Sequence, residues 1–77
     1  MSKRTDNYSF ETKQAMARRR VATVCLKYMH RNKLSEVQFA NLIRLSVGQL
    51  KNILNKESNT TLNVLVKISE VTGENLI

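Results

Sequence analysis

The same helix-start signal, Ser-x-x-Gln, occurs twice near the middle of the chain. The two copies are Ser35 with Gln38 and Ser46 with Gln49. In this arrangement the serine hydroxyl accepts a hydrogen bond from the glutamine backbone N–H, and the glutamine side chain accepts one from the serine backbone N–H. Two N–H groups that a helix leaves unpaired at its start are thereby satisfied. The sequence therefore predicts that one helix begins after Ser35 and another after Ser46.

The spacing of the two signals limits the length of the first of these helices. The two serines stand 11 positions apart, which leaves room for about two helical turns over residues 36–43 and a tight turn at residues 44–45. The second helix is expected to run to about residue 55. Two short helices joined in this way are typical of the helix-turn-helix, in which the first helix crosses the DNA backbone and the second enters the major groove.

The flanking segments also carry helical patterns. Apolar residues recur at steps of three and four from residue 10 to about residue 32, and again over residues 62–71. Thr61 is a candidate N-cap for the last helix, and Gly73 suits the left-handed residue that closes a helix. The chain has no proline and only two glycines, and strand-type alternation is not sustained anywhere. We therefore predict an all-α protein.

The expected organisation is one small domain with an N-terminal arm. A chain of 77 residues is shorter than an average domain, which makes a second domain improbable. Residues 1–9 are polar and include Lys3 and Arg4, so they are predicted to form a flexible basic arm. Residues 10–77 are predicted to form a compact bundle of four to five helices, with the helix-turn-helix at about residues 35–55.

Charge favours a polyanionic partner. The chain carries 13 lysines and arginines against 6 aspartates and glutamates, a net charge of +7. Nine of the basic residues lie within residues 1–33. Such a balance suits nucleic acid or an anionic membrane surface, and charge alone does not choose between them.

Catalytic and metal-binding patterns are missing from the sequence. One cysteine, Cys25, and one histidine, His30, are too few for an internal disulfide or a zinc site. The six carboxylates show no paired spacing, and no glycine-rich phosphate loop occurs. We therefore expect no enzyme activity, no cofactor and no metal. Apolar runs of only two or three residues predict neither a membrane span nor an export signal, so a cytoplasmic location is expected.

The pair of short helices has apolar residues where a packed helix-turn-helix needs them. These positions are Phe39, Ala40, Ile43, Leu45, Leu50 and Ile53. The second helix leaves Val47, Gly48, Lys51, Asn52 and Asn55 off this stripe, without a single acidic residue among them. An acid-free helix face avoids repulsion from DNA phosphates.

The stretch LSEVQFANLIRLSVGQLKNILNK, followed by LNVLVKISEVTG, resembles the Xre-type, lambda repressor-like helix-turn-helix family. The resemblance covers roughly residues 25–77. It implies a four- to five-helix bundle that binds operator DNA as a homodimer, with a recognition helix that begins after Ser46. Arg44 stands where the family usually has a glycine in the turn, and Lys56 replaces a second usual glycine. A residue other than glycine in a left-handed conformation costs roughly 1 kcal/mol.

The predicted DNA contacts follow from this arrangement. Val47 is expected to touch a thymine methyl, and Asn52 to pair with adenine through two hydrogen bonds. At the positive end of the recognition helix, Ser46 and Gln49 are expected near the DNA backbone, and Gly48 is expected to permit close approach. The remaining contacts are predicted to phosphates or along a groove, and they are Arg44, Lys51, Asn55, Lys56, Lys3 and Arg4.

The sequence is interpreted as a small transcriptional regulator, most simply a repressor that acts by occupying a pseudo-palindromic operator. Leu76 and Ile77 are the apolar residues expected to be exposed at the dimer contact. One alternative is an antitoxin-like DNA-binding protein that also binds a partner toxin. An alternative from another class is a basic helical module that binds an anionic membrane or an acidic protein, in which residues 18–20, the arginine triplet, would dominate binding.

Overall fold

The computed structural model describes residues 10–57 and 60–77. For residues 10–11 it describes the backbone only. The predicted arm with Lys3 and Arg4 lies outside the described residues. The described part of the chain forms four helices and no strand: α2 (Phe10–Asn32), α3 (Glu36–Leu42), α4 (Val47–Leu54) and α5 (Leu62–Thr72). The prediction of an all-α protein is therefore confirmed for these residues.

Both predicted capping boxes are present at the starts of α3 and α4. The Ser35 Oγ accepts from the Gln38 N–H at 3.1 Å, and the Gln38 Oε1 accepts from the Ser35 N–H at 2.8 Å. At α4 the corresponding Ser46–Gln49 distances are 3.1 Å and 3.0 Å. The Thr61 Oγ1 likewise caps α5 by accepting from the Val64 N–H at 3.3 Å.

The helix ends share one backbone geometry. Lys33, Arg44 and Lys56, which follow α2, α3 and α4, have positive φ angles of 53°, 57° and 62°. Gly73 closes α5 at a φ of 80°. The expectation of a left-handed residue at Arg44 and at Gly73 is confirmed, and each of the three basic residues carries a strain of about 1 kcal/mol that glycine avoids.

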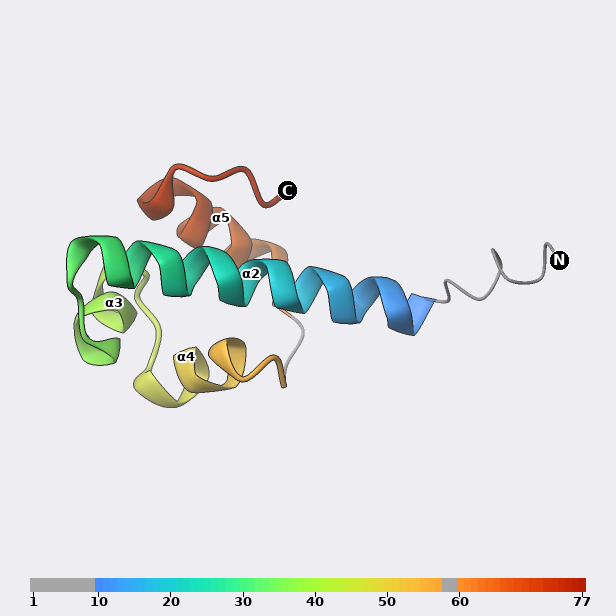
Figure 1. Ribbon diagram of the computed structural model, residues 1–77, viewed down its shortest axis with the longest axis horizontal. Coiled ribbons are helices and arrows are strands. Elements are labelled where there is room, and N and C mark those ends of the chain that lie inside the picture. The colour runs from blue at the N-terminus through green and yellow to red at the C-terminus, as the bar shows by residue number, and fades with distance from the viewer. Residues whose placement is uncertain (1–9, 58–59) are drawn as a thin grey trace, which may run out of the picture.

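α2 is the central helix of the bundle and packs against both α4 and α5, while α3 packs against α4 (Figure 1). The core comprises Val21, Ala22, Cys25 and Met29 from α2, Phe39 and Ala40 from α3, and Ile43, Leu50, Ile53 and Ile68. The Tyr28 and Phe39 rings lie with centroids 5.8 Å apart. Of the six packing positions predicted for the helix pair, Leu45 is half-buried against the core, and the other five are buried: Phe39, Ala40, Ile43, Leu50 and Ile53.

The N-terminal turns of α2 extend beyond α4 and α5 (Figure 1). Ala17 falls on the predicted apolar face of this helix, yet it is exposed. Helical periodicity identifies the face of a helix that turns inward, but not how far the neighbouring helices reach along it. The buried face of α2 therefore begins only at Val21.

Candidate nucleic-acid interface

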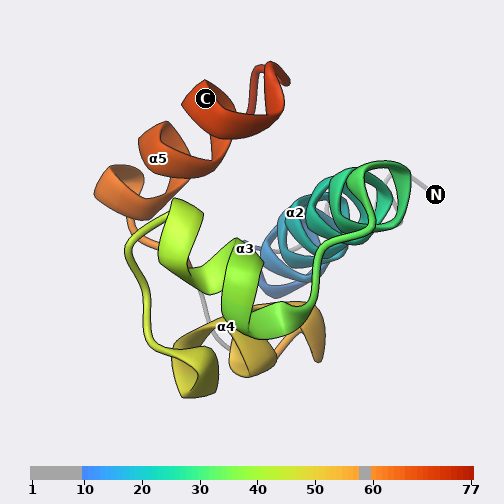
Figure 2. The ribbon, with the colours of Figure 1, turned by 90° about the vertical axis from the view of Figure 1, so that its left-hand side faces the viewer.

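α4 lies along one edge of the molecule, on the side away from α5 (Figure 2). Leu50 and Ile53 anchor it, because both side chains are buried in the core. Lys51, Asn52 and Asn55 are exposed. α4 thus has the inward and outward faces that the sequence predicts.

Val47 departs from the predicted pattern. It is half-buried and packs against the core cluster rather than standing clear of it. The expectation that Val47 lies off the buried stripe is therefore wrong, because the first turn of α4 sits close against the rest of the bundle. Only part of this side chain is available to a base.

The side chains at the start of α4 are engaged with each other. The Gln49 Oε1 accepts hydrogen bonds from both the Ser46 N–H and the Ser46 hydroxyl, at 3.0 Å and 3.2 Å. The Ser46 hydroxyl is therefore paired with Gln49 within the free chain. The groups that remain are the backbone N–H groups of Val47 and Gly48, since the first N–H groups of a helix have no partner within it, and the Gln49 side-chain NH2.

Gly48 occupies an exposed position in the first turn of α4. A Cβ built there would meet only the Ser46 Oγ, at 3.9 Å, which is an ordinary contact distance. The backbone φ angle of Gly48 is not positive. Neither the backbone nor the packing of this chain therefore requires a glycine at position 48.

Asn52 lines a groove of ≈ 230 Å³ between α4 and the start of α5. Gln49, one turn earlier, lines the same groove, as do Thr60 and Thr61 from the segment that leads into α5. The two predicted residues therefore lie on the same side of α4. Thr60 was not predicted here, because no local pattern in the sequence brings residue 60 to residue 52.

Arg44 lies elsewhere. It lines a separate groove together with Leu42 of α3 and with Lys67 and Glu70 of α5. The structure does not bring Arg44 together with Gln49 and Asn52. Arg44 and Lys56 are both exposed, and each directly follows the C-cap of its helix, Ile43 for α3 and Asn55 for α4.

The two residues predicted at a dimer contact differ in their surroundings. Ile77 is 69% exposed. Leu76 packs against the core cluster, and its N–H donates to the Ser69 Oγ at 3.2 Å. The expectation that Leu76 is exposed is therefore wrong: the chain folds back after Gly73 and places this side chain against α5 and the core.

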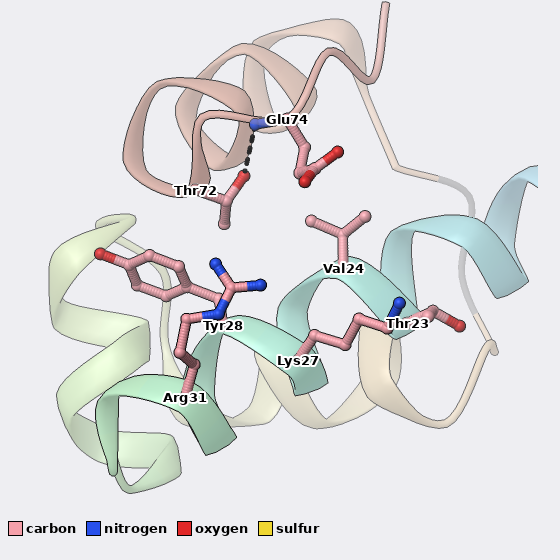
Figure 3. Close-up of a pocket in the computed structure, with 7 residues that line it drawn as sticks. All are labelled: Thr23, Val24, Lys27, Tyr28, Arg31, Thr72 and Glu74. Atoms are coloured by element: carbon pink, nitrogen blue, oxygen red, sulfur yellow. Dashed lines mark hydrogen bonds between the residues drawn. The ribbon is translucent and has the colours of Figure 1, made fainter.

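A second basic surface follows the exposed side of α2. Lys27 and Arg31 extend from α2 into a cleft that also holds Tyr28 and Thr72, and Glu74 reaches the same cleft from the segment after α5 (Figure 3). Nearer the N-terminus of α2, the Arg20 Nη2 donates to the Asn75 carbonyl at 2.8 Å. The C-terminal segment therefore meets this surface through the Asn75 carbonyl, and the Glu74 carboxylate lines its cleft.

The arginine triplet at residues 18–20 does not form one surface. Arg18 is half-buried and lines a groove between α2 and Leu65, whereas Arg19 and Arg20 are exposed. Consecutive helical residues point about 100° apart, so the three guanidinium groups diverge. This arrangement offers less to a flat anionic membrane than a stripe of cations would.

Cys25 and His30 show no reactive arrangement. Cys25 is a buried free thiol, and burial raises its pKa to about 12. His30 is exposed in the last turn of α2. Within residues 10–57 and 60–77, no three His, Cys, Asp or Glu side chains gather as metal ligands would. Nor does any described helix combine the length and hydrophobicity needed to cross a bilayer.

Comparison with known proteins found no matching family model, no matching curated protein and no matching solved structure.

Proposed function

We propose that this chain is a sequence-specific regulator that binds double-stranded DNA, with α3, the turn and α4 acting as a helix-turn-helix. One observation carries the proposal. α4 is fixed from inside by buried Leu50 and Ile53 while its outer side presents Lys51 and Asn52. No residue of α4 is acidic, so the exposed side of this helix meets DNA phosphates without repulsion from its own side chains.

The start of α4 supports the same orientation. Backbone N–H groups at a helix start favour an anion, because they lack partners and carry the positive end of the helix dipole. Ser46 and Gln49 hold the first turn in place through their reciprocal hydrogen bonds. Gly48 leaves the helix surface without a side chain at this point, so the DNA backbone reaches the helix closely.

Each exposed side chain of α4 has a proposed task. Asn52 reads a base edge, with adenine as the partner that matches its donor and acceptor. It lines one groove together with Gln49 and Thr60, so polar side chains flank the proposed base reader. Lys51, Asn55 and Lys56 are proposed to hold phosphates, which position the helix without reading the sequence. Val47 is half-buried, so only the exposed part of its side chain is proposed to touch a thymine methyl.

We further propose that the chain binds as a homodimer and regulates by occupying its operator. A single helix of 8 residues reaches few base pairs, and a dyad doubles the sequence that is read. Half-sites would then lie about 10–10.5 base pairs apart, centre to centre. Ile77, which is 69% exposed, is the remaining C-terminal candidate for the contact between protomers.

The test is selection of bound duplexes from a random DNA pool, followed by titration of the selected duplex and a scrambled one. Recovery of a motif with dyad symmetry, bound far more tightly than the scrambled duplex, supports the proposal. Lys51→Ala is expected to weaken binding, whereas Lys27→Ala removes an equal charge from the α2 cleft and is expected to leave it unchanged.

Equal affinity for both duplexes would contradict the proposal. So would an equal effect of Lys51→Ala and Lys27→Ala, because binding would then depend on total charge rather than on α4. In either case vesicles with anionic lipids and acidic proteins become the partners to test.

A further inference from the structure

Three of the four described helices end on a basic residue in the left-handed conformation. These residues are Lys33, Arg44 and Lys56, with φ between 53° and 62°. At the end of α5 the equivalent left-handed position holds Gly73. Glycine is the residue that adopts this conformation without strain, so three helices carry a strain that the fourth avoids.

The three ends have the same hydrogen-bond geometry. The N–H one residue beyond each left-handed position donates back to a carbonyl five residues earlier, and the three pairs are Leu34–Met29, Leu45–Ala40 and Glu57–Asn52, each at 2.9 Å. This motif places a left-handed residue immediately before the donating N–H. The positive φ angles are therefore a requirement of the helix ends rather than local irregularities.

Neither packing nor the helix dipole accounts for a basic residue at these positions. Lys33 and Lys56 are both exposed, so their side chains gain no burial within the described chain. A cation does favour the negative end of a helix. That preference is equally met by a cation in the last helical turn, such as Arg31 of α2, where the backbone is unstrained.

Lys33 and Lys56 lie beside the two helices of the proposed interface. Lys33 precedes Ser35, the N-cap of α3, and Lys56 follows Asn55, the C-cap of α4. α4 and the first turn of α3 lie together on the side of the molecule away from α5 (Figure 2). Arg44 differs, because it shares its groove with Glu70 of α5.

We propose that Lys33 and Lys56 are a pair of phosphate contacts that flank the α3–α4 unit, retained at positions where glycine would make the free protein more stable. Lys33 is a contact that neither the motif nor the charge distribution identified. This inference rests on the proposed function, since the phosphates are those of bound DNA. Stability and binding are therefore expected to change in opposite directions when these two residues become glycine.

The experiment compares three double variants of the full chain with the wild type. Lys33→Gly with Lys56→Gly is expected to raise Tm by at most about 4 °C per site, because the freedom that glycine adds to the unfolded chain offsets part of the relieved strain. Loss of two phosphate contacts lowers the slope of log affinity against log salt by about 1.8, so the fall in affinity between 50 and 200 mM salt becomes about 12-fold smaller.

Two further pairs separate strain from charge. Lys33→Gln with Lys56→Gln keeps the strained backbone, so it is expected to lower the salt slope equally without raising Tm. Lys27→Gln with Arg31→Gln removes two charges from the α2 cleft and is expected to leave the slope unchanged. The readouts are thermal melting by circular dichroism and titration of the selected duplex by fluorescence anisotropy.

The outcomes are distinct. A wild-type chain that binds its selected duplex specifically, together with a glycine pair that keeps the wild-type salt slope, overturns this inference and leaves the proposed function standing. An α2 control pair that lowers the slope as much as the glycine pair also overturns it. A wild-type chain with no preference for any duplex overturns both.

Discussion

Gly48→Ala is expected to stabilise the free protein and to weaken its binding to DNA. In the free protein the added methyl meets only the Ser46 Oγ, at 3.9 Å, so it has room. Alanine is the better helix former, and replacement of a helical glycine gains about 0.5 kcal/mol in the first turn, the low end of the usual range. For a chain of this size that corresponds to a rise in Tm of roughly 2–4 °C.

In the proposed complex the same methyl lies between α4 and the DNA. A methyl forced into a close-packed contact costs about 1–3 kcal/mol, which is a loss of roughly 5- to 150-fold in affinity for the selected duplex. The stability change and the affinity change thus have opposite signs. A general disturbance of the fold would instead lower both.

The matched control is Asn63→Ala. Asn63 is exposed and, like Gly48, is the second residue of its helix, but it belongs to α5. Its replacement is expected to leave DNA affinity unchanged. Thermal melting measures the stability of each variant, and anisotropy titration measures its affinity.

Two results would refute this reasoning. A Gly48→Ala variant with wild-type affinity would show that DNA does not approach the start of α4. A lowered Tm would show that position 48 has less room than the 3.9 Å separation indicates.

The further predictions concern four single side chains. Asn52→Ala is expected to cost about 1–3 kcal/mol on the selected duplex and to relax the preference at one base pair, whereas Lys51→Ala weakens all duplexes and lowers the salt slope by about 0.9; competition titrations with base-substituted duplexes separate the two. Phe39→Ala, at a fully buried position, is expected to lower the free energy of unfolding by about 3–5 kcal/mol in urea titrations. Burial raises the pKa of the Cys25 thiol from 9.0 to about 12, so the unfolded chain loses this proton first as pH rises. The free energy of unfolding is then expected to be unaffected below about pH 9 and to fall by about 1.4 kcal/mol per pH unit up to about pH 12, relative to a Cys25→Ala variant measured alongside.

Each of these has a contradicting result. Equal loss of affinity on every duplex for Asn52→Ala would remove its assignment as a base reader. A change below about 1 kcal/mol for Phe39→Ala would mean that the core closes over the space left by the ring. A constant difference in stability between the wild type and Cys25→Ala from pH 8 to pH 11 would show that the thiol ionises as freely in the folded chain as in the unfolded one.

The sequence predicted the helices closely. α2 has the predicted bounds, while α3 and α4 end one residue before their predicted ends because Ile43 and Asn55 are C-caps. Serine and threonine caps and the left-handed Gly73 were all anticipated. These features depend on hydrogen bonds between residues three to five positions apart, so a local pattern contains the information that determines them.

The candidate interface was predicted in part. The exposure of Lys51, Asn52 and Asn55 follows from the helical period once Leu50 and Ile53 point inward. The period does not say how closely the first turn of α4 approaches the bundle, and for that reason the partial burial of Val47 was missed.

Local sequence patterns were enough to show where the helices begin and end and which face of each turns inward, because capping bonds and helical periodicity act over a few residues. The tertiary structure alone decided which distant segments meet. It set Arg44 beside Glu70, Asn52 beside Thr60, and Leu76 against the core. Such contacts join residues that are far apart along the chain. They depend on the angles at which whole helices pack, and side-chain volumes across the entire core set those angles.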